Sequence, residues 1–489
     1  MRRVIWPMRV LIAISLGVPV RIIRRLLRRP PRIWQGFMPL HSLTASVKAD
    51  RLAGFPSQSV VKQPCQIRTH ALTTGADFDV VIAFDGGETH DQHWKCLCHL
   101  LQHGDIWVTQ HEPFFPDRHK RRNDFVFRLL RLAGIRIVVF PYGADVAWRD
   151  RCRDRYDWVG RAQEDNMDWN LVEWGEATRA RVGLFSKYAD FVIGMDGSLV
   201  RFLKRNDLYF KSFPVDTDRL KPADPPRNPV PLIVHAPNHR RVKGTDVLIG
   251  AMKRLKALGI ECELEIVEKV DRDTAFEIYR RADIIADQFV MGAYGVFALE
   301  ALALGKPTLT YLDHDHLENP VFNLPIVNTT HENMVEVLAA VVQVPALRQR
   351  LGAEARRQVV AYQSQEAMAE VWKQLYEHVW WRKPLHLEST RHFSPDRNAR
   401  SFSENPSDAD FWPVPVDDLM PEIRRVLERL IRHSLDESSA LSELAESPDA
   451  RDSRGSRLDV REWREPRIAA AKSSKRKPRS YSGSHSSKE

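Results

Sequence analysis

One stretch of the sequence, residues 282–312, limits the folds open to this chain more than any other. Its first apolar run, 284–286, is typical of a buried strand and leads into a loop that contains two glycines. A short apolar helix is predicted from Val296, and a Gly-Lys-Pro sequence ends it before a second buried strand over 308–312. Strand, loop, helix and strand form a βαβ unit. Its loop lies at the carboxyl edge of a parallel sheet, where such sheets bind ligands.

The predicted helix carries one carboxylate, Glu300, in an otherwise apolar sequence. A helix that is apolar on nearly all sides is buried, so Glu300 needs an Arg, Lys or amide partner, or hydroxyls supplied by a ligand. The backbone N–H groups at 293–296 form a helix start suited to phosphate, and Glu300 follows about one and a half turns later. This spacing fits a diphosphate and a ribose. A structural turn, with Glu300 bonded to a neighbouring strand, is the alternative interpretation.

The segment G-x-Y-G-x-x-x-x-E-A-x-A-x-G-K-P resembles the donor-binding segment of retaining GT-B glycosyltransferases of the family 4 type, also called glycosyl transferases group 1. The pattern of that family is E-G-F-G-x-x-x-x-E-A-x-A-x-G-x-P. The resemblance implies that Glu300, at the second Glu of the pattern, binds the ribose of a nucleotide sugar. The first Glu of the family contacts the donor sugar, and Gly292 stands at that position here.

A basic loop, A-P-N-H-R-R-V-K-G-T-D, follows the strand predicted over 232–235. Lys243 supplies a point charge for a diphosphate, and an Arg supplies a fork. The family carries an Arg and then Lys-Gly in this loop. Lys243 matches the lysine, whereas Asn238 stands at the usual arginine position, so Arg240 or Arg241 would substitute. A merely basic surface turn is the alternative. The predicted donor-binding residues are Arg240, Arg241, Lys243, Gly244, Gly292, Ala293, Tyr294, Gly295 and Glu300.

The first half of the chain opens with strand, loop, helix and strand, which is typical of a Rossmann-like domain. Its predicted strands cover 32–35, 59–61, 78–84, 106–109 and 136–140. The resemblance places several of its loops on the acceptor side of the fold. A Y-G-A-D turn after the last of these strands is similar to the family's G-x-D turn, although Gly-x-Asp is also a common turn and helix cap. The acceptor-side candidates are His41, His111, Gly143 and Asp145.

Histidines gather at His90, His93, His99 and His103, and the last two share one face of a predicted helix. No carboxylate or thiol completes a spacing typical of a zinc site, so no metal is predicted. The Asp-His-Asp-His sequence over 313–316 is expected to be a solvated loop. The five cysteines are scattered without a C-x-x-C pair, which favours a reducing cytosol.

The first 31 residues combine arginines with an apolar run over 10–20. This run is too short for a bilayer span, which needs about 20 residues, and no small-residue cleavage site follows. The segment is therefore predicted to be an amphipathic helix on an anionic inner-membrane face, and a poorly ordered leader is the alternative. The net charge of +9 comes largely from the two ends, so no nucleic-acid partner is expected.

The predicted fold class is α/β: a GT-B architecture of two Rossmann-like domains facing a cleft, with a largely disordered C-terminal tail. The expected order is a basic amphipathic leader (1–31), an N-terminal acceptor domain (32–224), a C-terminal nucleotide-sugar donor domain (225–365), a helix crossing back to the first domain (366–382), and a mostly disordered tail (383–489) with one amphipathic helix near 419–431. A proline-rich connector, 222–229, marks the boundary between the domains.

The resemblance implies a glycosyltransferase of the hexosyltransferase type, acting with retention and without metal or another cofactor. Its expected partners are a nucleotide-sugar donor, a glycan, lipid-linked or small-molecule acceptor, and an anionic membrane surface, and its expected location is cytoplasmic and peripheral to the membrane. Two alternatives stay open. One is a sugar-nucleotide epimerase of the same fold. The other is a non-catalytic, membrane-associated scaffold, because Gly292 replaces the first Glu of the family.

Overall fold

The computed structural model describes residues 2–37, 41–62, 66–67, 70–71, 77–82, 90–143, 145–146, 171–195, 197–200, 202–209, 213–222, 228–290, 292–312 and 324–385. The predicted helix near 419–431, the loop over 313–316 and most of the predicted C-terminal tail lie outside these residues.

Seven parallel strands form the first sheet, in the order β5-β2-β1-β6-β7-β8-β9. The strands are β1 (Ile33–Gln35), β2 (Ser57–Val61), β5 (Val80–Val81), β6 (Ile106–Thr109), β7 (Arg136–Val139), β8 (Phe191–Gly194) and β9 (Leu208–Tyr209), and β3 (Gln66–Ile67) and β4 (His70–Ala71) form a separate antiparallel pair. The helices of the part of the chain that forms the seven-stranded sheet are α1 (Arg2–Leu26), α2 (His41–Leu52), α3 (His90–His103), η2 (Asp117–His119), α4 (Lys120–Leu132), α6 (Leu171–Tyr188) and α7 (Gly197–Val200).

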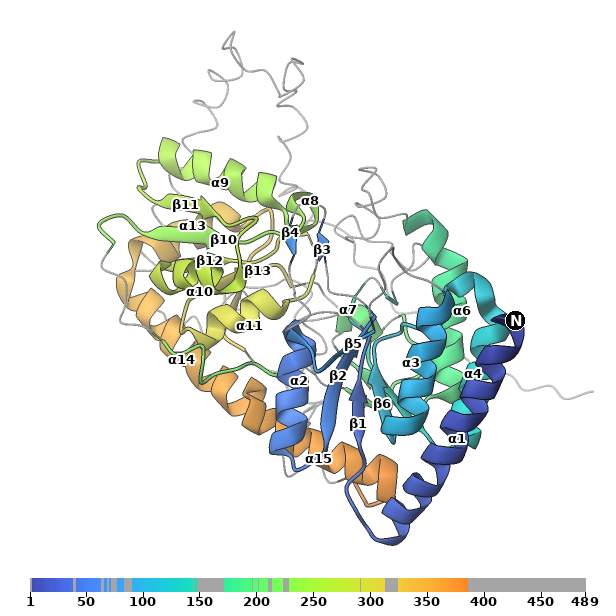
Figure 1. Ribbon diagram of the computed structural model, residues 1–489. Helices are drawn as coiled ribbons and strands as arrows, with labels where there is room; N and C mark the ends of the chain where they lie inside the picture. The colour runs from blue at the N-terminus through green and yellow to red at the C-terminus, as the bar shows by residue number, and fades with distance from the viewer. Residues whose placement is uncertain are drawn as a thin grey trace, which may run out of the picture. The chain divides into compact units, whose positions relative to one another are not determined.

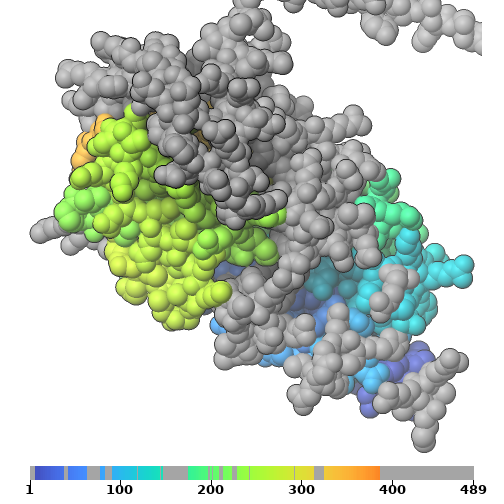
Figure 2. All heavy atoms as spheres, turned by 90° about the horizontal axis from the view of Figure 1, so that it is seen from above, coloured from blue at the N-terminus to red at the C-terminus, as the bar shows by residue number. Residues whose placement is uncertain are grey.

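Five parallel strands form the second sheet, in the order β11-β10-β12-β13-β14. The strands are β10 (Leu232–His235), β11 (Glu263–Ile266), β12 (Ile284–Ala286), β13 (Thr308–Thr310) and β14 (Ile326–Asn328). The helices are α8 (Arg240–Lys243), α9 (Thr245–Ala257), α10 (Arg272–Arg281), α11 (Val296–Ala303), α13 (Met334–Gln343), α14 (Pro345–Gln363) and α15 (Gln365–Trp381). Figure 1 shows α9 on one side of this sheet and α10 and α11 on the other, and Figure 2 shows yellow-green atoms of this part of the chain at the surface.

The central strands of both sheets are buried nearly along their whole length, because helices cover both faces of each sheet. β6, β8, β12 and β13 consist entirely of buried residues. This is the pattern of a parallel sheet covered by helices on both sides. The two parallel-sheet α/β domains therefore agree with the fold class that the sequence predicts.

Each sheet reverses its strand order at one point. In the first sheet the chain moves from β1 to β2 and β5 on one side and then to β6 on the other, and in the second it moves from β10 to β11 and then to β12. Loops at the carboxyl ends of the two strands on either side of such a switch point separate and leave a crevice for a ligand. The loops after β10 and β12 contain the residues that the sequence selects for donor binding.

The N-terminal segment forms a regular helix, α1, that packs against α3. Arg21 is buried in this contact, and its guanidinium donates to the carbonyl oxygens of Leu101 and Ala133 at 2.8 Å and of Gly104 at 3.0 Å. These carbonyls lie at the ends of α3 and α4, where helices leave acceptors unsatisfied. Burial lowers the pKa of Arg21 to about 10, so the side chain stays charged at pH 7.

One element prediction needs correction, and one helix was not predicted. The strand expected over 78–84 is reduced to β5, Val80–Val81, and residues 83–84 lie outside the described residues. The helix α4 was not predicted because its basic residues hide its apolar face. Val126, Phe127 and Leu130 are buried on that face.

Candidate donor-binding site

The site lies at the switch point of the second sheet, where β10 and β12 are paired neighbours. His235 ends β10 and is fully buried. Its Nδ1 lies 2.8 Å from the carbonyl oxygen of Ala286, which can only accept, so Nδ1 carries the proton and Nε2 accepts from the Thr245 hydroxyl at 2.8 Å. Burial lowers the pKa of His235 to about 4, so the ring is neutral at pH 7. It fixes the start of α9 to the end of β12.

Lys243 and Gly295 both direct donors at one carboxylate. The Lys243 ammonium lies 2.9 Å from Oδ1 of Asp287, and the backbone N–H of Gly295 donates to Oδ2 at 3.3 Å. Asp287 follows β12 directly and is fully buried, whereas the Lys243 side chain is 12% exposed. A cation and the start of α11 therefore hold a negative charge at the carboxyl edge of the sheet.

Gln288 and Gly244 complete the local arrangement. The Gln288 side-chain oxygen accepts from Lys243 at 2.5 Å, and its amide group donates to the carbonyl of Ala293 in the glycine loop. Gly244 adopts a left-handed φ of 74°, and a Cβ there would lie 3.0 Å from Cβ of Phe289. The glycine after Lys243 is thus required both by backbone conformation and by close packing.

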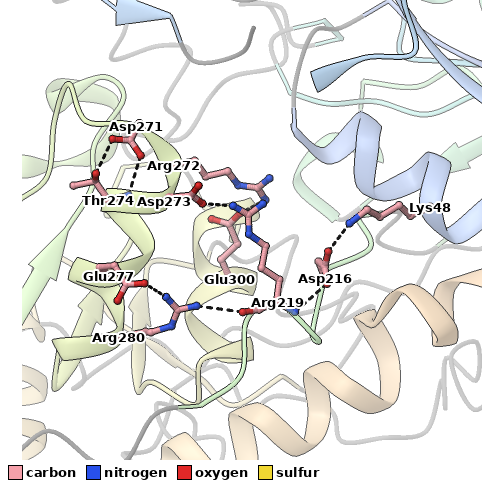
Figure 3. Close-up of polar contacts among 10 residues, drawn as sticks. All are labelled: Lys48, Asp216, Arg219, Asp271, Arg272, Asp273, Thr274, Glu277, Arg280 and Glu300. Carbon is pink, nitrogen blue, oxygen red and sulfur yellow. Dashed lines mark hydrogen bonds and ion pairs between the residues drawn. The ribbon is translucent and has the colours of Figure 1, made fainter. Parts of the chain in front are cut away.

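Glu300, on α11, is paired with Arg272 at the start of α10, with Nη2 3.1 Å from Oε1 (Figure 3). Burial raises the pKa of Glu300, and the positive charge of Arg272 opposes this effect. The partner that the sequence requires for this carboxylate is therefore an internal arginine. Arg219 lies in the same group, where it pairs with Asp273 (Figure 3).

The predicted donor-binding residues do not all meet. Arg240 is turned toward Glu268, and its Nε and Nη2 donate to the two carboxylate oxygens at 2.9 and 2.7 Å. Arg241 is exposed, whereas Gly292, Ala293 and Tyr294 are buried in the loop before α11. The structure thus brings Lys243 to Gly295 and places the arginine fork of Arg240 in a surface ion pair.

Sequence reasoning missed four residues of this site, namely His235, Arg272, Asp287 and Gln288. A local signal for two of them exists, because the polar pair Asp-Gln directly follows the apolar run of β12 at the ligand-binding edge. His235 and Arg272 had no such signal. Lys306, in the Gly-Lys-Pro sequence, has a structural role, since its ammonium donates to the carbonyl of Ala282 at 2.8 Å.

Three of the four acceptor-side candidates lie together in the first domain. Asp145 accepts from the backbone N–H groups of Tyr142 at 2.8 Å, Gly143 at 2.7 Å and His111 at 3.1 Å. Nδ1 of the buried His111 lies 3.6 Å from the same carboxylate. Burial acts to raise the pKa of Asp145, but His111 and the backbone donors outweigh it and hold the pKa below its ordinary value.

His111 follows β6 by two residues, and β6 borders the switch point of the first sheet. His41, the fourth candidate, is the first residue of α2, and its side chain lies outside the described residues. His99 and His103 share a helix face, as expected, with ring centroids 4.6 Å apart. Within the described ranges no group of three His, Cys, Asp or Glu side chains is placed to hold a metal ion.

No family model and no curated protein matches this chain. Among solved structures, it is similar to sucrose-phosphate synthase from Thermosynechococcus elongatus, with a TM-score of 0.50 and 14% identity over 73% of this chain and 100% of that chain. HepE from Anabaena in complex with UDP has a TM-score of 0.45 and 11% identity, covering 70% of this chain and 97% of that chain.

The catalytic domain of starch synthase IV from Arabidopsis thaliana, bound to ADP and acarbose, has a TM-score of 0.45 and 13% identity, covering 72% of this chain and 99% of that chain. The likeness to sucrose-phosphate synthase covers 100% of that chain and 73% of this one. Together with the two parallel-sheet domains, it shows that this chain has the GT-B fold.

Proposed function

We propose that this chain is a glycosyltransferase that moves a sugar from a nucleotide-sugar donor to a glycan, lipid-linked or small-molecule acceptor. The observation that carries the proposal is the convergence of Lys243 Nζ and Gly295 N–H on the carboxylate of Asp287. Carboxylate and phosphate oxygens accept the same charge-assisted hydrogen bonds. Donors aimed at one point beside a switch point therefore suit the diphosphate of a nucleotide sugar.

Glu300 is proposed to bind the ribose. It lies five residues beyond Gly295, on the same helix, and its ion pair with Arg272 counters the burial that favours the neutral acid. An ionised carboxylate can accept hydrogen bonds from two vicinal hydroxyls. The helix start and Glu300 would then contact the two ends of a ribosyl diphosphate.

The transfer breaks the bond between the anomeric carbon and the diphosphate oxygen and forms a bond to an acceptor hydroxyl oxygen, whose proton is released. Lys243 and the N–H groups at the start of α11 would stabilise the charge that develops on the leaving diphosphate. The proposed reaction therefore needs no metal ion, and the resemblance to family 4 enzymes supports retention at the anomeric carbon. The His111–Asp145 group is proposed to lie on the acceptor side.

The first test is a titration of the full-length protein with UDP, GDP and ADP, in which binding is measured by thermal shift and by calorimetry. One nucleotide is expected to raise Tm. Lys243→Met and Glu300→Gln are each expected to weaken its binding by about tenfold or more, because each removes hydrogen bonds to a charged group. Glu277→Gln is the matched control, since Glu277 is an exposed carboxylate on α10 paired with Arg280.

If no nucleotide shifts Tm while the protein is folded, the donor site is refuted. Turnover is tested separately with the sugar conjugates of the nucleotide that binds, by release of free nucleotide with and without acceptor. Binding without turnover would favour a non-catalytic scaffold, in line with Gly292 at the position of the first Glu of the family. The anomeric configuration of the product, read by NMR, tests retention.

A further inference from the structure

α1 has two chemically different faces. Its inner face packs on α3 and consists of buried residues spaced by three or four positions, which are Trp6, Val10, Ala13, Gly17 and Arg21. The packing is close, because a Cβ added at Gly17 would lie 1.8 Å from the carbonyl oxygen of Leu101. Figure 1 shows α1 running along α3, with α4 beside it.

The opposite face of α1 is apolar and exposed. At 3.6 residues per turn its side chains centre on the side away from α3. They are Met8, Leu11, Ile12, Leu16, Val20, Ile22, Ile23 and Leu26, with exposed fractions from 39% to 77%. Ser15, a polar residue among them, donates its hydroxyl to the carbonyl of Ile12 at 2.8 Å. Its hydroxyl is therefore satisfied within the helix.

α4 adds a second exposed stripe, in which Arg121, Phe125, Arg128 and Leu132 follow one another by three or four positions. Phe125 is 56% exposed and Leu132 is 84% exposed. The stripe ends beside α1, because Arg21 of α1 donates to the carbonyl oxygen of Ala133, the residue after Leu132. We call the outward faces of α1 and α4 together the α1–α4 surface.

We propose that the α1–α4 surface binds the headgroup and upper acyl region of an anionic membrane. Arginines border its apolar residues: Arg9 on α1, Arg28 and Arg29 in the turn after it, and Arg121 on α4. Apolar side chains that enter the interface beside cations that face anionic headgroups are the pattern of a helix lying on a membrane. A second copy of the chain fits less well, since two-fold pairing of this surface would bring arginines against arginines.

The same contacts favour a helix that lies on the membrane over one that crosses it. By length and composition alone, the 21 residues Trp6–Leu26 could span a bilayer. Spanning would remove Arg21 from its three carbonyl acceptors and separate the buried face of α1 from α3. It would also place a charged guanidinium in the hydrocarbon core, which is costly.

The test is flotation of the full-length protein with vesicles of phosphatidylcholine alone or mixed with phosphatidylglycerol. Binding is expected with the mixed vesicles, and it is expected to weaken at high salt. The triple variant Leu11→Gln/Leu16→Gln/Leu26→Gln is expected to lose about tenfold or more of this binding, because it removes apolar area from the interface. Phe125→Gln/Leu132→Gln tests the contribution of α4 and is expected to weaken binding in the same direction.

The matched control is Leu52→Gln/Val360→Gln, which changes exposed apolar residues on α2 and α14, and it is expected to bind as the parent does. All variants replace exposed side chains, and an unchanged Tm would verify that each is folded. Equal binding to neutral and anionic vesicles, or none to either, would overturn the proposal. Resistance to alkaline extraction would show a spanning helix instead, and a change in oligomeric state without vesicles in the triple variant would identify a second copy as the occupant.

Discussion

Asp287 is the residue on which the charge balance of the candidate donor site depends. Its two oxygens accept from the Lys243 ammonium and from the backbone N–H of Gly295, and its side chain is fully buried. A largely buried cation that loses its carboxylate partner is costly. If a diphosphate binds here, it can replace the charge that such a loss removes.

We therefore predict that Asp287→Asn lowers the Tm of the free protein but increases the rise in Tm that the bound nucleotide produces. The diphosphate would compensate the Lys243 charge in the variant, whereas in the parent protein Asp287 already does so. Asp283→Asn is the matched control, because Asp283 is also buried but precedes β12, where it accepts from the backbone N–H of Leu232 at 2.9 Å. A nucleotide-induced rise in Tm that is equal in Asp287→Asn and the parent would contradict the prediction.

At the residue scale, the sequence predicted Lys243 and Glu300 but not their partners. The lysine precedes a glycine at a predicted helix start, and the glutamate stands alone in an apolar helix, so both are visible in a short window of sequence. Asp287 is 44 residues from Lys243, and Arg272 is 28 residues from Glu300. Such partners become visible once strand pairing has brought the loops together.

Among the elements, α15 is joined to α2 by a buried polar group. The Tyr376 hydroxyl donates to Oδ1 of Asp50 at 2.8 Å, and Ser57 and Gln35 donate to Oδ2 at 2.7 and 2.9 Å. Burial raises the pKa of Asp50 to about 6, although the three donors oppose the effect. The last described helix thus packs on the first domain through a carboxylate that is costly to ionise.

This raised pKa leads to a prediction about stability and pH. Below the pKa of Asp50 in the unfolded state, near 4, the side chain is protonated in both the folded and the unfolded protein. As the pH rises from 4 to 6, Asp50 ionises in the unfolded protein before it does so in the folded one, so the free energy of unfolding falls. Relative to Asp50→Asn, the parent is expected to lose about 3 kcal/mol over this interval and nothing further above it. Urea unfolding at a series of pH values, followed by tryptophan fluorescence, measures the difference.

Asp79→Asn is a control of opposite sign for this experiment. Burial acts to raise the pKa of Asp79, but hydrogen bonds from Arg51 and Ser59 outweigh it and lower the pKa below its ordinary value. Asp79 therefore stabilises the parent above the unfolded pKa, and this stabilisation is lost as the pH falls through the folded pKa. The difference in free energy of unfolding between parent and variant should therefore change with pH in opposite directions for Asp50→Asn and Asp79→Asn. A change in the same direction would show that the Asp50 assignment is wrong.

For the whole molecule, the contacts described for the donor site come from residues 235–300, whereas α1 is anchored in the core of the first domain. We predict that Arg21→Met lowers stability by about 2–4 kcal/mol, because it leaves the carbonyls at the ends of α3 and α4 without their donor. The Kd of the nucleotide is expected to change by less than about twofold, since distant sites act independently.

Urea unfolding and calorimetric titration of the same preparations of Arg21→Met measure the two quantities side by side. Lys243→Met provides the converse case, with weakened nucleotide binding in a protein whose α1 contacts are intact. A Kd that rises tenfold or more in Arg21→Met would show that the core of the first domain and the donor site are coupled.

The sequence by itself determined the α/β class, the position of most strands, and the two segments, after β10 and after β12, that contain Lys243 and Glu300. These features are local, because apolar runs, glycines and helix starts act within a few residues of the chain. The tertiary structure decided that Asp287 faces Lys243, that Arg240 is held by Glu268, and that α1 belongs to the first domain. Those outcomes depend on parallel strand pairing and helix packing between segments far apart in sequence, which no local pattern encodes.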